Sequence, residues 1–137
     1  MKKLLFTCLA LATLAVSMPF CGKKGGTSDS CSTEKTLTVT TSPANGANEA
    51  AAPGPTFPLT VTIGSTLPTS GVTIQVKARP DGVSTTFFTE ERSSTSASNS
   101  FTITGTPAST TCVVEITVTS KTCATNKWTG SYRYSRK

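Results

Sequence analysis

Apolar and polar residues alternate with a period of two in several short segments between Leu37 and Tyr134. Because successive side chains of an extended chain point to opposite faces, this period predicts strands with one buried and one exposed face. The exposed positions are rich in Thr, which is β-branched and favours strands. No segment has the period or the end signals of a helix. The pattern restricts the chain to folds whose core is built by sheets alone.

Seven short strands are predicted, separated by turn and loop signals. Pro80-Asp81-Gly82 predicts a turn, residues 42–55 a Pro- and Gly-rich loop, and residues 93–100 a polar loop. Inward rows on every strand require two sheets packed face to face, so residues 36–137 are predicted to be an all-β sandwich. The inward rows, in chain order, are Leu37 and Val39; Leu59, Val61 and Ile63; Val72, Ile74, Val76 and Ala78; one of Phe87 and Phe88; Phe101 and Ile103; Cys112, Val114, Ile116 and Val118; and Trp128, Gly130, Tyr132 and Tyr134.

The segment LTVTTSPANGA, from Leu37 to Ala47, is followed by an alternating strand. It is similar to the opening of bacterial immunoglobulin-like domains, which commonly serve as stalks, spacers or adhesive modules. The resemblance implies an immunoglobulin-like antiparallel sandwich of about seven strands. It also implies a non-enzymatic interaction, adhesion or structural role. The second strand lacks a Cys and Trp128 lies on the last strand, so an antibody-type core is not expected.

The N-terminus has the pattern of an export signal. Two lysines precede an apolar run from Leu4 to Val16. This run is shorter than the roughly 20 apolar residues that span a bilayer, and it is typical of a secretory signal. Cleavage after Ser17 would give a chain that begins at Met18, whereas cleavage after residue 20 would give one that begins at Cys21. No second apolar stretch follows, so no transmembrane helix is expected in the mature protein.

An apolar run that ends at Cys21 and is followed by polar residues 22–28 resembles the bacterial lipoprotein signal. The residues before the Cys, Met18-Pro19-Phe20, depart from the usual pattern of that signal. The resemblance implies a signal peptide over residues 1–20, a lipid on Cys21 and a flexible tether over residues 21–35. It further implies a membrane partner, and Gly22 favours the outer membrane because the acidic retention signal is missing. The domain would face the periplasm or the cell surface, where an envelope protein or a glycan is the expected partner.

The chain has five cysteines, of which Cys8 lies in the predicted signal. If Cys21 is acylated, three remain in a compartment that permits disulfides. In a sandwich, Cys31 and Cys123 lie at the same pole and are the predicted pair. Cys112 begins the sixth strand at the other pole, and strands rise about 3.3 Å per residue against a limit of about 7 Å between bridged Cα atoms. The alternative pair, Cys112 and Cys123, would require a much shorter sixth strand.

The residues that usually carry catalysis are missing or badly placed. The chain has no His and no CxxC spacing, so neither a metal site nor a catalytic Cys is expected. Glu90 and Glu91 are neighbours, and on a strand they point to opposite faces. The net charge is +6 and falls to +4 without Lys2 and Lys3, with no clustered basic patch for a nucleic acid. We therefore expect no enzyme activity and no cofactor.

Trp128, Tyr132 and Tyr134 share one face of the last predicted strand. Their parity matches the inward rows of the other strands, which favours packing in the core. If that face were exposed instead, the three rings could form a stacking platform. The alternative function is therefore a small secreted or periplasmic domain that binds a glycan or another ligand.

Overall fold

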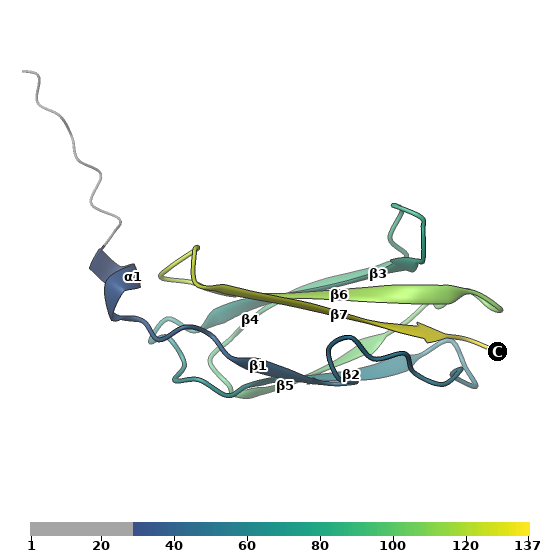
Figure 1. The fold of residues 1–137 in the computed structure, drawn as a ribbon, viewed down its shortest axis with the longest axis horizontal. Helices are drawn as coiled ribbons and strands as arrows, with labels where there is room; N and C mark the ends of the chain where they lie inside the picture. Colours follow the sequence, from purple (N-terminus) through teal and green to yellow (C-terminus); the bar gives the residue numbers. More distant parts are fainter. Residues whose placement is uncertain (1–28) are drawn as a thin grey trace, which may run out of the picture.

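A computed structural model describes residues 29–137 of the chain. The predicted signal peptide, the lipid site at Cys21 and most of the predicted tether lie outside the described residues. The described elements form two antiparallel sheets packed face to face (Figure 1). The elements are α1 (Asp29–Thr33), β1 (Val39–Ser42), β2 (Phe57–Ile63), β3 (Val72–Pro80), β4 (Phe88–Ser94), β5 (Ser98–Ile103), β6 (Thr111–Ser120) and β7 (Lys127–Ser135).

The smaller sheet has the order β1-β2-β5 and the larger one the order β4-β3-β6-β7. The predicted immunoglobulin-like sandwich of seven strands is therefore confirmed. In the constant-type immunoglobulin arrangement the fourth strand joins the sheet of the first, second and fifth strands. Here β4 pairs with β3 instead, and the chain crosses from one sheet to the other between β4 and β5.

The core lies between the two sheets, as the alternation of apolar and polar residues predicts. In the larger sheet β3 and β6 run side by side, with Val76 opposite Ile116 and Ile74 opposite Val118. Burying a side chain of this size stabilises the fold by about 1.5–3 kcal/mol. The core residues of the smaller sheet and its flank are Leu37, Leu59, Val61, Ile63, Phe101 and Ile103.

The polar loop predicted over residues 93–100 is wrong. Strand β4 continues to Ser94 and β5 begins at Ser98, which leaves a connection of only residues 95–97. The polarity of this segment reflects its place on two edge strands, where alternate residues face solvent. The side chain of Asn99 is buried, and its Nδ2 donates a hydrogen bond to the carbonyl of Ser96 (2.9 Å).

The predicted loop over residues 42–55 is confirmed, except that Ser42 still belongs to β1. It follows the outer edge of β7, where Arg133 donates its backbone N–H to the carbonyl of Ala47 (2.8 Å) and accepts from the N–H of Glu49 (2.8 Å). Isolated parallel bridges join Asn48 to Arg133 and Ala52 to Arg136. Covered edges are protected from pairing with another chain.

On the opposite side of the sandwich, Arg92 closes the gap between the edge strands β4 and β5. It lies opposite Ile74, on the inner side of the sheet. Its guanidinium stacks on the Phe101 ring, 4.5 Å from the centroid, and donates to the backbone carbonyl of Ser100 (3.1 Å). A second nitrogen binds Glu90. An inward-pointing charge is one of the devices that keep edge strands from pairing with other chains.

Within residues 29–137, no helix is long and apolar enough to cross a membrane.

Candidate functional site

The N-terminal segment is joined covalently to the sandwich. Cys31 of α1 and Cys123 of the β6–β7 loop form a disulfide, with their Cα atoms 5.1 Å apart. This is the first of the two pairings that the sequence allowed, and Cys112 is free and buried at the other end of β6. At the end of the predicted tether, residues 29–33 form the helix α1, which the disulfide joins to the domain.

A polar cluster next to the disulfide holds the same segment, and its centre is the carboxylate of Glu34. The hydroxyls of Ser120 (3.0 Å) and Thr122 donate to its Oε1, and Nδ2 of Asn126 donates to its Oε2 (3.0 Å). Asn126 also accepts a hydrogen bond from the backbone N–H of Leu37 (2.9 Å). We call this group, together with the disulfide, the anchor pole. It connects the start of the domain to the β6–β7 loop at one end of the sandwich (Figure 1).

The hydrogen bonds of the anchor pole favour the charged form of Glu34. Those from Thr122 and Asn126 hold the pKa of the Glu34 carboxyl below its usual value of 4.5. A carboxyl whose pKa is lower in the folded state binds fewer protons there than in the unfolded state. Its stabilising effect is thus complete above pH 4.5 and is lost as the pH falls through the folded pKa.

We expect Glu34→Gln to remove part of the acid sensitivity of the protein. The unfolding free energy of the variant, measured by urea denaturation, should fall below that of the native chain at pH 6. The difference should narrow towards pH 3, because the contribution of the native carboxylate is lost as the pH falls through its folded pKa. Parallel losses of stability in the two chains between pH 6 and pH 3 would contradict the role given to this carboxylate.

The aromatic residues of β7 are part of the core. Tyr132 and Tyr134 are each 1% exposed, and the ring of Phe57 lies 4.3 Å from that of Tyr134. The Tyr134 hydroxyl bonds to that of Thr106 (2.6 Å), and burial raises the pKa of Tyr132. Trp128 is half-buried against the same core. The core packing favoured by the sequence is confirmed, and the two tyrosines are not available for stacking on a ligand.

Gly130 follows Trp128 on the same face of β7 and has no side chain, and the indole ring of Trp128 lies over this position. A Cβ atom on Gly130 would lie 2.3 Å from the indole ring and 2.9 Å from Oδ1 of Asn45. That oxygen accepts a hydrogen bond from the backbone N–H of Ser131 (2.8 Å). The glycine therefore makes room for the ring, which packs against the core.

A second feature is a loop that rises from the outer face of the larger sheet, between β3 and β4, at the pole opposite α1 (Figure 1). It begins with a turn in which Val83 donates its N–H to the carbonyl of Pro80 (3.1 Å). Gly82 has a φ of 77°. Pro80 thus ends β3 and is the first residue of the predicted turn, whose two central residues are Asp81 and Gly82.

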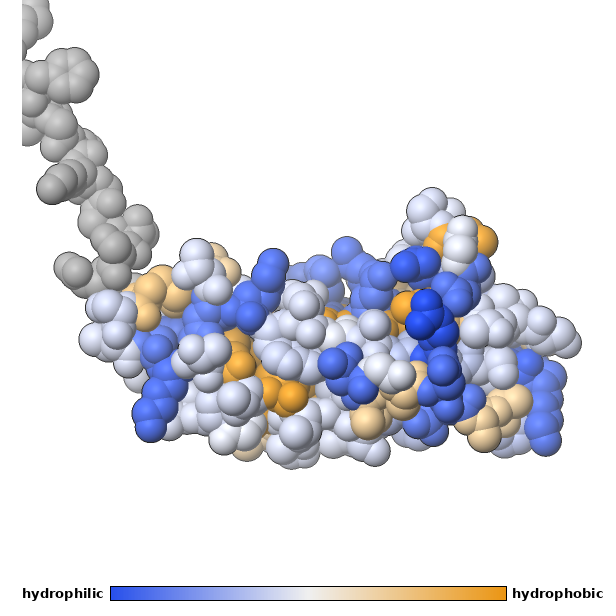
Figure 2. All heavy atoms as spheres, viewed as in Figure 1, coloured by the Kyte–Doolittle hydropathy of each residue, from blue (hydrophilic) through white to orange (hydrophobic). Residues whose placement is uncertain are grey.

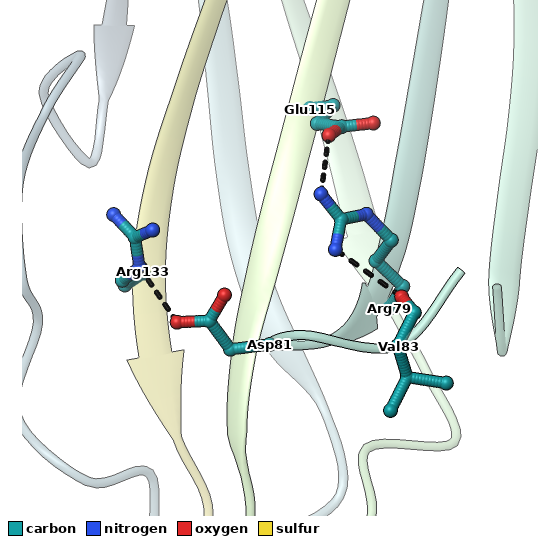
Figure 3. Close-up of polar contacts among 5 residues, drawn as sticks. All are labelled: Arg79, Asp81, Val83, Glu115 and Arg133. Carbon is teal, nitrogen blue, oxygen red and sulfur yellow. Dashed lines mark hydrogen bonds and ion pairs between the residues drawn. The ribbon is translucent and has the colours of Figure 1, made fainter. Parts of the chain in front are cut away.

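Two ion pairs brace the base of this loop (Figure 3). On one side Nη2 of Arg79 binds Glu115 (2.9 Å) while Nη1 donates to the carbonyl of Val83 (3.2 Å). On the other side Asp81 reaches over β6 to Arg133 of β7 (2.9 Å). The Arg133 guanidinium holds the pKa of Asp81 below its usual value. We call residues 80–87 the braced loop.

The remaining candidates for chemistry do not come together. Glu91 lies opposite Gln75 on the outer face and accepts a hydrogen bond from it (2.9 Å), whereas Glu90 lies on the inner side with Arg92. Burial raises the pKa of the Cys112 thiol, which keeps it protonated. In the part of the chain from Asp29 to Lys137, no three side chains of metal-binding type form a group.

The sequence matches no protein-family model, and no curated protein is detectably similar to it.

Sequence reasoning missed the braced loop and the anchor-pole cluster. The PDG turn was recognised, but the partners of Arg79 and Asp81 lie 36 and 52 residues away along the chain. Glu34 likewise binds residues 86 to 92 positions further on. Only the pairing register of the strands brings these groups together.

Proposed function

We propose that this protein is a non-enzymatic envelope lipoprotein whose immunoglobulin-like domain serves as an interaction, adhesion or structural module. The observation that carries the proposal is the disulfide between Cys31 and Cys123. Disulfides persist in oxidising compartments such as the periplasm and the cell surface and are rare in the cytosol. The apolar N-terminal run and Cys21 supply the export signal and the lipid site that such a location requires.

The position of the anchor pole fits a membrane tether. Cys21 and Cys31 are ten positions apart in the sequence, a length of chain that reaches at most about 35 Å. A lipid on Cys21 would therefore keep the anchor pole close to the bilayer. A force applied to the tether would be transmitted through the disulfide to the β6–β7 loop. It would therefore not act on β1 alone and separate that strand from its sheet.

The opposite pole would then face away from the membrane. It carries the braced loop and the C-terminus of the described chain (Figure 1). Conformationally fixed loops at the end of a rigid sandwich are frequent sites of binding. The alternative glycan platform gains no support, because Tyr132 and Tyr134 are buried.

The test is the intact mass of the mature protein isolated from its membrane. We expect an N-terminus at Cys21, a mass increase equal to a diacylglycerol with or without a further acyl chain, and one closed disulfide. A Cys21→Ser variant should lose the added mass and the partition into detergent. An unmodified chain that begins at Met18 would overturn the lipoprotein proposal, and two free thiols at Cys31 and Cys123 would remove its main support.

A further inference from the structure

A groove of about 530 Å³ lies between the braced loop and the outer face of the larger sheet. Its floor is formed by Lys77 and Arg79 of β3 and Glu115 of β6. Its wall is formed by four residues of the loop, Gly82, Val83, Ser84 and Thr86. Figure 2 shows the raised loop with apolar surface on it above a polar face. Val83 on this loop is 46% exposed, and it is the one large hydrophobic side chain exposed among residues 31–137.

The charges of the groove leave one cation available. Arg79 and Glu115 neutralise each other, since their ion pair is closed at 2.9 Å. The ammonium of Lys77 makes no hydrogen bond or ion pair with any described residue, although Lys77 lies directly opposite Glu115 in the register. The groove thus offers a positive group to an incoming anion.

The wall of the groove offers main-chain donors. The turn uses the N–H of Val83, and the N–H of Phe87 donates to Ala78 (2.9 Å). Between them, the N–H groups of Ser84 and Thr86, two residues that line the groove, have no partner among the described residues. Unpaired backbone groups of this kind are the means by which exposed segments pair with an extended peptide.

The two ion pairs at the base of the loop hold these groups in place before a ligand arrives. Arg79 binds the carbonyl of Val83 and Arg133 binds Asp81 at the start of the loop. The N–H of Phe87 binds the carbonyl of Ala78 at its end, so both sides of the loop are fastened to the larger sheet. A surface held in its bound conformation loses less entropy on binding than a mobile one.

We propose that this groove binds an acidic peptide segment of a protein partner. A carboxylate of the peptide lies against Lys77, and the peptide backbone pairs with Ser84 and Thr86. An apolar side chain next to the carboxylate packs on Val83. A sugar ligand fits these observations less well, because none of the aromatic side chains between residues 31 and 137 is exposed for stacking. This inference rests on the proposed role as an interaction module and names the site of that role.

The test uses the full chain, isotope-labelled, and two blocked peptides as probes, Gly-Val-Glu-Val-Gly and its neutral counterpart Gly-Val-Gln-Val-Gly. We expect the glutamate peptide to shift the amide resonances of Ser84 and Thr86 in a saturable way. Lys77→Gln should weaken that binding by about two- to fivefold, the range of an exposed ion pair. Lys127→Gln is the matched control, because Lys127 is exposed on the same sheet face, outside the groove.

Three results would overturn the inference: no shift of these amides, equal binding of the neutral peptide, or equal losses in the Lys77 and Lys127 variants. Saturable shifts of the same amides by sodium glucuronate but not by the glutamate peptide would identify an acidic sugar as the ligand and also refute it. The intact mass of the same preparation separates the two proposals. A lipidated chain whose groove amides do not shift refutes only the peptide-binding inference. A chain that starts at Met18 refutes only the lipid anchor.

Discussion

Replacing Cys31 and Cys123 together by Ala is expected to lower the unfolding free energy by about 2–5 kcal/mol. The bridge joins residues that are 92 positions apart, so its loss frees almost the whole domain in the unfolded state. Alanine is chosen because Cys123 is buried, where a serine hydroxyl would add a desolvation cost of its own. The measurement is the urea midpoint of the full chain at neutral pH.

Reduction provides the control for this result. Dithiothreitol should shift the midpoint of the native chain towards that of the double variant and leave the double variant unchanged. Each single variant should lose about as much stability as the double one, because either change opens the bridge. A native midpoint that does not respond to the reductant would show that the bond does not contribute to stability.

Gly71→Ala should be the most damaging of the glycine substitutions, with a loss of about 2–5 kcal/mol. Gly71 precedes β3 with a φ of 78°, a conformation that costs an L-residue about 1–2 kcal/mol. A Cβ atom there would also lie 2.3 Å from the backbone carbonyl oxygen of Ser94, which cannot move without disturbing the end of β4.

Two other glycines separate the cost of the backbone conformation from the cost of the steric clash. Gly82→Ala in the braced loop meets the same backbone cost at a φ of 77° but has no atom within 4 Å, so about 1–2 kcal/mol is expected. Gly54→Ala has neither burden and should change the unfolding free energy by less than about 1 kcal/mol. Equal effects at Gly71 and Gly82 in urea denaturation would contradict the close approach of Ser94.

Much of the fold could be predicted because its signals are local. The row in β3 alternates regularly, and β6 departs from alternation only at Val113, which is buried as well as its neighbours. Burial of one face follows directly from that period. The bridge between Cys31 and Cys123 followed from knowing which strand ends share a pole. The edge strands were harder, since Ser and Thr on β4 and β5 have the composition of a loop. Their pairing with β3 and β2 decided that they are strands.

The sequence by itself determined the all-β class, the inward rows and the pole at which the disulfide closes, because these depend on a two-residue period and on the rise of a strand. Only the tertiary structure decided that residues 42–55 cover the edge of β7, that Arg92 closes the opposite side, and that Arg79, Asp81 and Arg133 brace one loop above a groove. These contacts join residues distant in sequence, and only the register of paired strands places their side chains within reach of one another.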